Sequence, residues 1–450
     1  MEFDHLIHNA LVLTLEPGVP PLANGYVAVQ GDRIAAVGQE ASAAELPAAR
    51  EQLDVQGSLV MPGLINTHTH AAMTLFRGLA DDLPLEDWLH KYIFPAEVRY
   101  VDAEFVHWGT RLAIAEMLRG GITTVGDGYF FAAAARHAYL ETGLRAVMAQ
   151  GVLDFPVPGV PDPQDNLKVA AEFIDSGAGG GQRLVTSTLF CHAPYTCRAG
   201  TLQQAKALTR ERNLPFFIHL AETQAEVDRM KQVHGLSPVA YLDSLGILDS
   251  LTVAAHAIWV DEADQEILAR RGVKVSHCPE GNLKLASGVA PVPELLHKGI
   301  CVGLGTDGAA SNNNLDLFGE MALAAKLHKV IRLDPTCLPA PEVVALATRE
   351  GARVLGLADR TGTITPGKAA DLIILDLDQP HLTPLYDPYS HLVYAARAAD
   401  VKDVMADGRW LLREREFLTL DWDETRQRVH ELTHSRGMSS FGASDLEPPV

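Results

Sequence analysis

The sequence predicts an α/β protein with a closed barrel of eight βα units and a small β-sandwich formed from both ends of the chain. Between Leu59 and Asn312, short apolar and β-branched runs alternate with longer helical patterns, the element order of stacked βα units. Both flanks of this region carry strand patterns instead. The length of 450 residues suits a barrel of roughly 250 to 300 residues with one further module.

Eight apolar runs are the predicted barrel strands. They end near residues 66–68, 125–127, 149–151, 190–192, 218–220, 255–257, 275–277 and 305–307. Helical patterns lie between them, for example over 102–119 and 201–212, and each is stopped by Gly or Asn. A doubly wound open sheet that binds a dinucleotide would need G-x-G-x-x-G after its first strand, and no such motif occurs there. The pattern therefore favours a closed barrel.

Strand patterns also cover the two ends of the chain, over residues 5–15, 25–38, 51–60, 371–377 and 401–412. Turns at Gly31-Asp32 and Asp407-Gly408 interrupt two of these stretches. We predict that these ends pair into one sandwich with the barrel inserted between them. The expected division is 1–59 and 369–434 for the sandwich and a trailing helix, 60–368 for the barrel, and 435–450 for a flexible tail rich in Ser, Gly and Pro.

The composition of the chain limits the kinds of molecule it can bind and the compartment it suits. The formal net charge of −20 disfavours binding to nucleic acid or to an anionic membrane. The five cysteines are scattered and odd in number, with no C-x-x-C pair, which indicates reduced thiols and a cytoplasmic protein. The first residues lack the pattern of a secretion signal, and no apolar run is long enough to span a membrane.

Metal-binding residue types end several predicted strands. His68 and His70 are two residues apart on a strand, so both side chains point to the same side. A bare H-x-H pair is common by chance. However, His219, His256 and Asp307 end the fifth, sixth and eighth runs, and the strand ends of a barrel converge on one face. If these five side chains had unrelated structural roles, each would have to lie at a strand end by chance. One shared site is therefore the better interpretation.

Three imidazoles and a carboxylate, from His68, His70, His219 and Asp307, suit a divalent ion with one open position for water. Zinc is the first expectation, and iron or manganese would also accept this ligand set. Such an ion lowers the pKa of a bound water toward about 7. Glu222 follows His219 by three residues and could carry protons between that water and a substrate nitrogen. The alternative is an ordinary acidic residue in a first helical turn.

The motif Met-Pro-Gly-Leu-Ile-Asn-Thr-His-Thr-His over 61–70, with segments 73–78 and 82–89, resembles the amidohydrolase superfamily. More narrowly, it is similar to the 5-methylthioadenosine/S-adenosylhomocysteine deaminases. Segments 192–196, 219–223, 282–285 and 305–313 support this resemblance, which spans nearly the whole chain. It implies hydrolytic deamination of an adenine nucleoside, with methylthioadenosine first and adenosine or S-adenosylhomocysteine as further candidates, to give ammonia and the inosine analogue.

The resemblance also implies roles for individual residues. The four ligands bind the metal, and Asp307 also accepts the proton of the attacking water. Glu222 protonates the adenine ring nitrogen next to the attacked carbon, while His256 orients or polarises the hydroxide. No lysine occurs in the fourth strand, over 183–191, where a modified lysine would bridge two metals, so we expect one ion per subunit.

The implied substrate-binding residues are Glu97, which would hold the ribose hydroxyls, together with Trp88, Gln150, His192 and Glu222. Gln150 stands where many relatives have an arginine. If that arginine holds an amino-acid carboxylate, its loss favours methylthioadenosine or adenosine over S-adenosylhomocysteine. The segment Cys-Pro-Glu-Gly over 278–281 also departs from the usual sequence of the family. The wall of the substrate pocket is therefore expected to differ from that of the relatives. Cys278 need not be a nucleophile, because attack by metal hydroxide requires none.

Two alternative functions stay open. The same machinery could act on guanine, cytosine or an s-triazine, although a ribose-binding Glu97 would then have no purpose. A barrel that has lost catalysis and serves in assembly or regulation is disfavoured by the intact ligand set. The resemblance further implies a homo-oligomer, for which a dimer is our expectation, and a small-molecule nucleoside as the binding partner.

Overall fold

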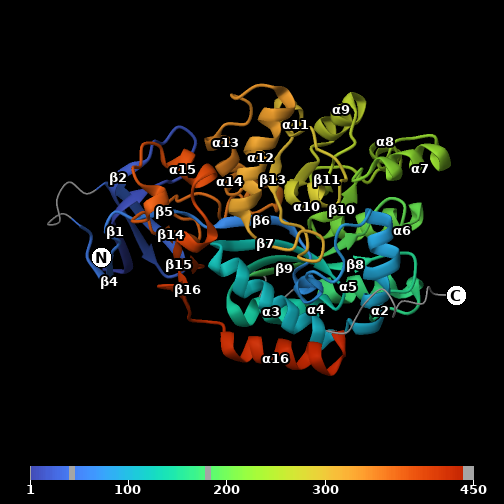
Figure 1. Ribbon diagram of the computed structural model, residues 1–450, viewed down its shortest axis with the longest axis horizontal. Coiled ribbons are helices and arrows are strands. Elements are labelled where there is room, and N and C mark those ends of the chain that lie inside the picture. Colours follow the sequence, from blue (N-terminus) through green and yellow to red (C-terminus); the bar gives the residue numbers. More distant parts are fainter. Residues whose placement is uncertain (1, 40–45, 178–183, 439–450) are drawn as a thin grey trace.

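The computed structural model describes residues 2–39, 46–177 and 184–438, and these residues form two sheets (Figure 1). The larger body of the molecule is a barrel of eight parallel strands that neighbour one another in chain order. They are β6 (Leu64–Thr69), β7 (Ile122–Tyr129), β8 (Arg145–Val152), β9 (Val185–Cys191), β10 (Phe216–Leu220), β11 (Thr252–His256), β12 (Lys274–His277) and β13 (Val302–Leu304). The predicted barrel is confirmed, and the eight expected strand ends lie within a few residues of those observed.

Hydrogen bonds close the barrel between its first and last strands. The Asp307 N–H donates to the His68 carbonyl at 3.0 Å, and the Thr67 hydroxyl donates to the Leu304 carbonyl at 2.8 Å. The approach is tight at Gly303 on β13, where a Cβ atom would lie 2.6 Å from Cγ2 of Thr67 on β6. This closure brings the residues after β6 and β13 side by side.

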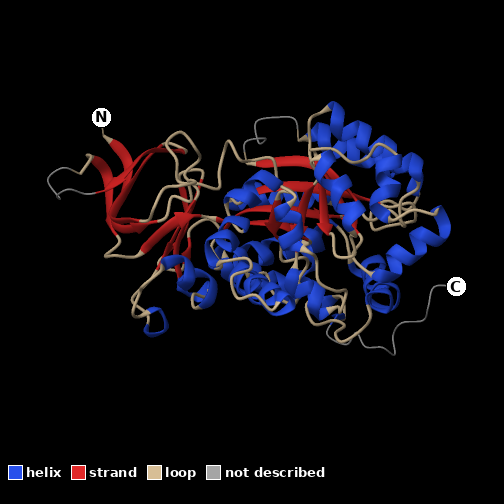
Figure 2. Cartoon of the chain, turned by 90° about the horizontal axis from the view of Figure 1, so that it is seen from above, coloured by secondary structure: helices blue, strands red, loops and turns tan. Residues whose placement is uncertain are grey.

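Helices surround the barrel, as Figure 2 shows. They are α3 (Ala103–Arg119), α4 (Ala132–Thr142), α5 (Asn166–Ser176), α6 (Ala199–Glu211), α7 (Gln224–His234), α8 (Pro238–Ser244), α9 (Glu262–Arg271), α10 (Pro279–Lys284), α11 (Val292–His297), α12 (Leu317–Arg332), α13 (Ala340–Leu346) and α14 (Arg349–Val354). The helices expected over 102–119 and 201–212 are α3 and α6. Asp102 caps α3, because its carboxylate accepts the Phe105 N–H at 2.9 Å.

A chain of short helical turns joins β6 to α3. It consists of η2 (Ala71–Phe76), α1 (Leu85–Trp88), the π-helical η3 (Leu89–Ile93) and α2 (Phe94–Tyr100). The remaining short turns among the described residues are η4 (Pro163–Asp165), η5 (Pro380–Leu382) and η6 (Ala398–Asp400). The segment from α1 to α2 places Trp88 and Glu97 beside the carboxyl ends of the barrel strands.

Both ends of the chain build the second sheet, which has nine strands in the order β17-β16-β15-β14-β5-β1-β2-β3, with β4 paired to β1. The strands are β1 (Phe3–Val12), β2 (Leu22–Gln30), β3 (Arg33–Gln39), β4 (Ala49–Asp54), β5 (Leu59–Pro62), β14 (Leu372–Leu375), β15 (Val401–Ala406), β16 (Arg409–Arg413) and β17 (Glu416–Phe417). Antiparallel pairing of β5 with β14 joins the two ends. One apolar cluster contains side chains from both halves, such as Val27 and Met405. The module predicted from both termini is therefore confirmed.

The chain ends with α15 (Pro388–Tyr394), the last strands of the second sheet and α16 (Trp422–Ser435). Arg111 on α3 forms an ion pair with Glu424 on α16 at 3.5 Å. The expected tail over 435–450 begins inside α16, and residues 439–450 lie outside the described residues. The exact division at 59/60 and 368/369 stays a prediction. No described helix is long and apolar enough to cross a membrane.

Candidate active site

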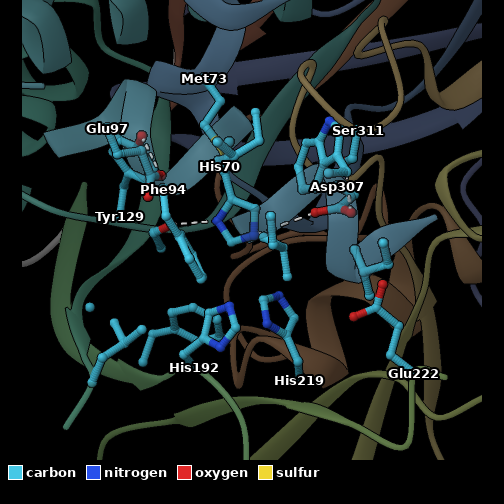
Figure 3. A pocket seen from close by; sticks show the side chains of 18 of the residues that line it. His70, Met73, Phe94, Glu97, Tyr129, His192, His219, Glu222, Asp307 and Ser311 are labelled. Atoms are coloured by element: carbon cyan, nitrogen blue, oxygen red, sulfur yellow. Dashed lines mark hydrogen bonds and ion pairs between the residues drawn. The ribbon is translucent and has the colours of Figure 1, made fainter. Parts of the chain in front are cut away.

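A cavity of about 720 Å³ lies at the carboxyl ends of the barrel strands. Figure 3 shows its side chains, which come from elements far apart in the sequence. Most of the residues singled out from the sequence line this cavity: His70, Trp88, Glu97, His192, His219, Glu222, His256 and Asp307. His68 is buried against them. The structure thus brings one cluster of titratable side chains to a single site.

The four expected metal ligands converge on one point. The Nε2 atoms of His68 and His70 each lie 3.4 Å from Oδ1 of Asp307. Nε2 of His219 lies 3.2 Å from Nε2 of His68. His256 adds a fifth group, because one donor atom of His68, His219, His256 and Asp307 each lies within 4.8 Å of the others.

These separations fit a metal ion. A tetrahedral ion with bonds of about 2.0 to 2.1 Å holds its ligand atoms about 3.3 to 3.4 Å apart. Nδ1 of His70 lies 2.6 Å from the Gly128 carbonyl. That contact assigns the ring proton to Nδ1 and leaves Nε2 free to bind a metal. The donor set and its spacing therefore suit a borderline divalent ion.

Burial keeps two of the histidine rings neutral. It lowers the pKa of His68 to about 4, although a hydrogen bond to Asp307 partly offsets this effect. Burial and the neighbouring His70 lower the pKa of His192 to about 3. At neutral pH both rings are therefore neutral, which is the form of histidine that binds metals.

Asp307 is fixed by its backbone and by a serine. Its φ is +58°, in the left-handed region, and its N–H is held by the His68 carbonyl described above. Oδ2 accepts a hydrogen bond from the Ser311 hydroxyl at 2.9 Å, as Figure 3 shows. Oδ1 consequently faces the histidines while Oδ2 is occupied by the hydroxyl.

Glu222 and His256 lie next to each other beside the expected metal ligands. Oε2 of Glu222 lies 3.8 Å from Nε2 of His256. Burial raises the pKa of Glu222, and the charge of His256 partly offsets that shift. Burial would lower the pKa of His256, but Glu222, Asp307 and Asn282 outweigh it and raise the pKa. Oδ1 of Asn282 lies 2.9 Å from Nδ1 of His256 and orients the ring.

Glu97 lies on the opposite side of the cavity from Glu222, as Figure 3 shows, and Trp88 also lines the cavity. Glu97 is 6% exposed, and the Tyr129 hydroxyl donates to its Oε1 at 2.8 Å. Burial raises the pKa of Glu97 to about 8 despite this hydrogen bond. His192 lies next to His219 in Figure 3, and its Nδ1 is 3.1 Å from the Thr196 hydroxyl.

Gln150 lies away from these residues. Its neighbour Gly151 lines the cavity, whereas Oε1 of Gln150 accepts the Ala132 N–H at 3.1 Å at the start of α4. The structure therefore does not bring Gln150 into the cluster as a substrate contact. Cys278 is fully buried, and burial raises the pKa of its thiol, so it has the character of a structural cysteine.

Several supporting residues were missed from the sequence. Asp127 accepts the Ala71 N–H at 3.0 Å and the Tyr139 hydroxyl at 2.8 Å, which fixes the chain just after His70. Glu226 holds the backbone of Glu222. The pattern Thr223-x-x-Glu226 resembles a capping box and is the signal that could have identified Glu226.

A (β/α)₈ barrel with histidines and an aspartate gathered at its strand ends defines a metal-dependent hydrolase. More specifically, the chain belongs to the amidohydrolase family, whose model matches residues 59–411.

Individual proteins of known name are similar to this chain over most of its length. A 5-methylthioadenosine/S-adenosylhomocysteine deaminase of Syntrophobacter fumaroxidans is 47% identical, over 96% of this chain and 98% of the relative. A 5'-deoxyadenosine deaminase of Methanothermobacter thermautotrophicus is 45% identical, over 89% and 92%. Among solved structures, an adenosine deaminase from Xanthomonas campestris with bound zinc has a TM-score of 0.94 and 38% identity, covering 97% of this chain and 99% of that one. The relatives are thus hydrolases that act on C–N bonds.

Proposed function

We propose that this protein is a zinc-dependent deaminase of adenine nucleosides, with 5'-methylthioadenosine as its first candidate substrate. The main observation behind this proposal is that one cavity holds Glu97 and Glu222 on opposite sides. Glu222 would contact the base. Glu97 would bind the sugar, since a buried carboxyl group can accept hydrogen bonds from two neighbouring hydroxyls. The names of the relatives support the same substrate class.

His68, His70, His219 and Asp307 would hold one zinc ion, with His256 beside it. When bound, such an ion supplies a water molecule of lowered pKa close to the ring carbon that carries the amino group. The residues of this chain then handle the protons. Asp307 accepts a proton from the water, and His256 orients the water through Nε2.

Glu222 donates a proton to the ring nitrogen next to the attacked carbon. Its raised pKa favours the protonated form that this step requires. The new C–O bond replaces the C–N bond, and the amino group leaves as ammonia after gaining the proton that Asp307 took from the water. Glu222 regains a proton from the new hydroxyl as the carbonyl forms. Water and the nucleoside are thereby converted to ammonia and the inosine analogue, with no other reactant.

The change in ultraviolet absorbance from adenine to hypoxanthine tests this proposal. Zinc-loaded protein is assayed with methylthioadenosine, adenosine, S-adenosylhomocysteine and free adenine at equal concentrations. We expect turnover of the nucleosides and none of the free base. Lack of turnover of all four by metal-replete protein would refute the proposal and would favour guanine, cytosine or triazine substrates.

A variant of Glu97 separates nucleosides from free bases as substrates. Glu97→Ala removes the carboxyl group assigned to the ribose and should raise the KM for nucleosides more than it lowers kcat. An unchanged KM would contradict the assignment of Glu97. Metal content of the variant, measured in parallel, shows that the ligand cluster is intact.

A further inference from the structure

Three metal-binding side chains also gather outside the barrel, on two neighbouring helices. His107 lies on α3, and His137 and Glu141 lie on α4. Figure 1 shows α3 and α4 side by side, and the two helices pack against each other. One donor atom of each residue lies within 4.8 Å of those of the other two. The three residues do not line the active-site cavity, so the mechanism proposed above does not use them.

The separations between these donor atoms approach those of a metal site. Nδ1 of His137 lies 3.3 Å from Oε1 of Glu141, and Nε2 of His107 lies 3.8 Å from Oε2 of the same carboxylate. Ligand atoms of a tetrahedral zinc ion lie about 3.3 to 3.4 Å apart. His137 and Glu141 are one helical turn apart, so their side chains lie on the same face of α4. Small rotations of the exposed side chains therefore suffice to bring all three groups to one ion.

Two contacts orient His107 and Glu141. The side chain of His107 is 20% exposed, and its ring hydrogen-bonds the backbone of Ala134 on α4. A hydrogen bond at one ring nitrogen leaves the other nitrogen free for a metal ion. Arg111 on α3 donates to Oε2 of Glu141 at 3.2 Å. Oε1 is therefore the carboxylate oxygen that is available beside His137.

The charge around this cluster also favours a cation. Arg111 is shared between Glu141 and Glu424 on α16, whose Oε2 lies 3.5 Å from Nη2 of the guanidinium. Two carboxylates thus surround one guanidinium, while imidazoles bind metals in their neutral form. The group carries one net negative charge, in a chain with a formal net charge of −20. A divalent cation is therefore attracted to this position despite the nearby arginine.

We propose that His107, His137 and Glu141 form a second metal site, called the helix site below, which binds a borderline divalent ion such as zinc. Two imidazole nitrogens and one carboxylate oxygen favour zinc over the hard ions magnesium and calcium. Water completes the coordination, because the side chain of His137 is 66% exposed. The bound ion joins α3 to α4. With three protein ligands at an exposed position, the helix site binds zinc more weakly than the barrel does. The expectation of one ion per subunit then applies to the barrel alone.

Equilibrium dialysis of the chelator-treated full chain against increasing zinc, with elemental analysis of the bound metal, tests the helix site. The parent protein should bind two ions per chain, the second at higher free zinc. His137→Ala and Glu141→Gln should each weaken binding of the second ion by at least about tenfold, since even residues that only orient metal ligands contribute about 10- to 100-fold. Binding of the first ion should not change. His430→Ala, at an exposed position on α16, is the matched control and should bind both ions as the parent does.

Three results would refute the helix site. The first is a parent protein that binds only one ion per chain. The second is a His137→Ala variant that binds as many ions as the parent with the same affinities. The third is displacement of the second ion by excess magnesium, which a site with two imidazole ligands should resist. The measurement uses no substrate, so its outcome does not depend on the proposed deamination.

Discussion

The carboxylate of Glu226 holds the backbone of Glu222. Its Oε2 accepts the Glu222 N–H at 2.8 Å, and its Oε1 accepts the Ala221 N–H at 3.0 Å. The Ala221 carbonyl accepts N–H groups from Ile258 at 3.1 Å and Trp259 at 2.9 Å. Ala221 has φ of +50°, which is unfavourable for an alanine. Bonds on both sides of this residue thus fix the turn that carries Glu222 from β10 into the cavity.

We expect Glu226→Gln to lower kcat about 10- to 100-fold, in the range typical of residues that orient a metal site. Glutamine keeps the shape of the side chain, but its NH₂ group would face a backbone N–H donor. KM and metal content should change little, because Glu226 is a positioning residue that does not line the cavity. Asp228→Asn, on the exposed side of the same helix, is the control. Unchanged kcat in Glu226→Gln would contradict the positioning role.

Glu222→Gln tests the proton donor itself. The amide cannot deliver a proton to the ring nitrogen, so turnover should fall roughly 100- to 10,000-fold, the range for loss of a general acid. Metal content, measured by elemental analysis, should equal that of the parent. Near-full activity in this variant would show that another group moves the proton.

Particular residues show how far the sequence could predict the site. His68, His219, His256 and Asp307 end strands, and the ends of parallel strands in a barrel must meet, so their convergence could be predicted without coordinates. The direction of Gln150 could not, because a shift of one residue along β8 turns a side chain from one face to the other.

Elements outside the repeats were also harder to predict. The short turns from α1 to α2 have no long periodic pattern, yet they deliver Trp88 and Glu97 to the cavity. The role of Glu97 came from resemblance to a family rather than from its own surroundings in the sequence. Its burial, and the hydrogen bond from Tyr129, depend on packing between segments that are distant in the chain.

Metal removal should destabilise the protein and abolish activity together. An ion that binds only the folded state stabilises it by about 2.7 kcal/mol at a free concentration of 100 times Kd. Adding zinc to chelator-treated protein should therefore raise the thermal midpoint and restore turnover. His219→Ala should lose both effects. His430→Ala is the matched control, because His430 lies at an exposed position on α16 and belongs to neither group of described residues that could hold a metal ion. A full zinc response in His219→Ala would contradict the ligand assignment.

Glu97 should make stability depend on pH. Its pKa is about 8 in the folded protein, raised by burial from an ordinary value of 4.5. The folded state therefore binds more protons than the unfolded state between pH 4.5 and 8. The stabilisation is complete below pH 4.5 and is lost as the pH rises through about 8.

The measurement is the free energy of urea unfolding at several pH values for the parent and for Glu97→Gln. Glutamine does not ionise. As the pH rises from 4.5 to 8, the free energy of unfolding of the variant relative to that of the parent should therefore increase by up to about 1.4 kcal/mol per pH unit. For the control Glu266→Gln, at an exposed position on α9, the free energy of unfolding should depend on pH in the same way as that of the parent. Parallel curves for Glu97→Gln and the parent would show that the Glu97 carboxyl titrates normally.

Arg145 joins the barrel to the sheet formed by the chain ends. It begins β8, is 1% exposed, and donates to the carboxylates of Asp371 and Asp407. Arg145→Met should lower the free energy of unfolding by about 3 to 5 kcal/mol, because Asp371 would stay buried without its charged partner. The activity of the folded molecules should be unchanged, since Arg145 lies at the amino end of its strand and the site lies at the carboxyl ends. Arg360→Met is the matched control: Arg360 also donates to Asp407, at 3.0 Å, but its side chain is 25% exposed, so its loss should cost less. Equal unfolding free energies for Arg145→Met and the parent in urea would show that this buried pair does not hold the two sheets together.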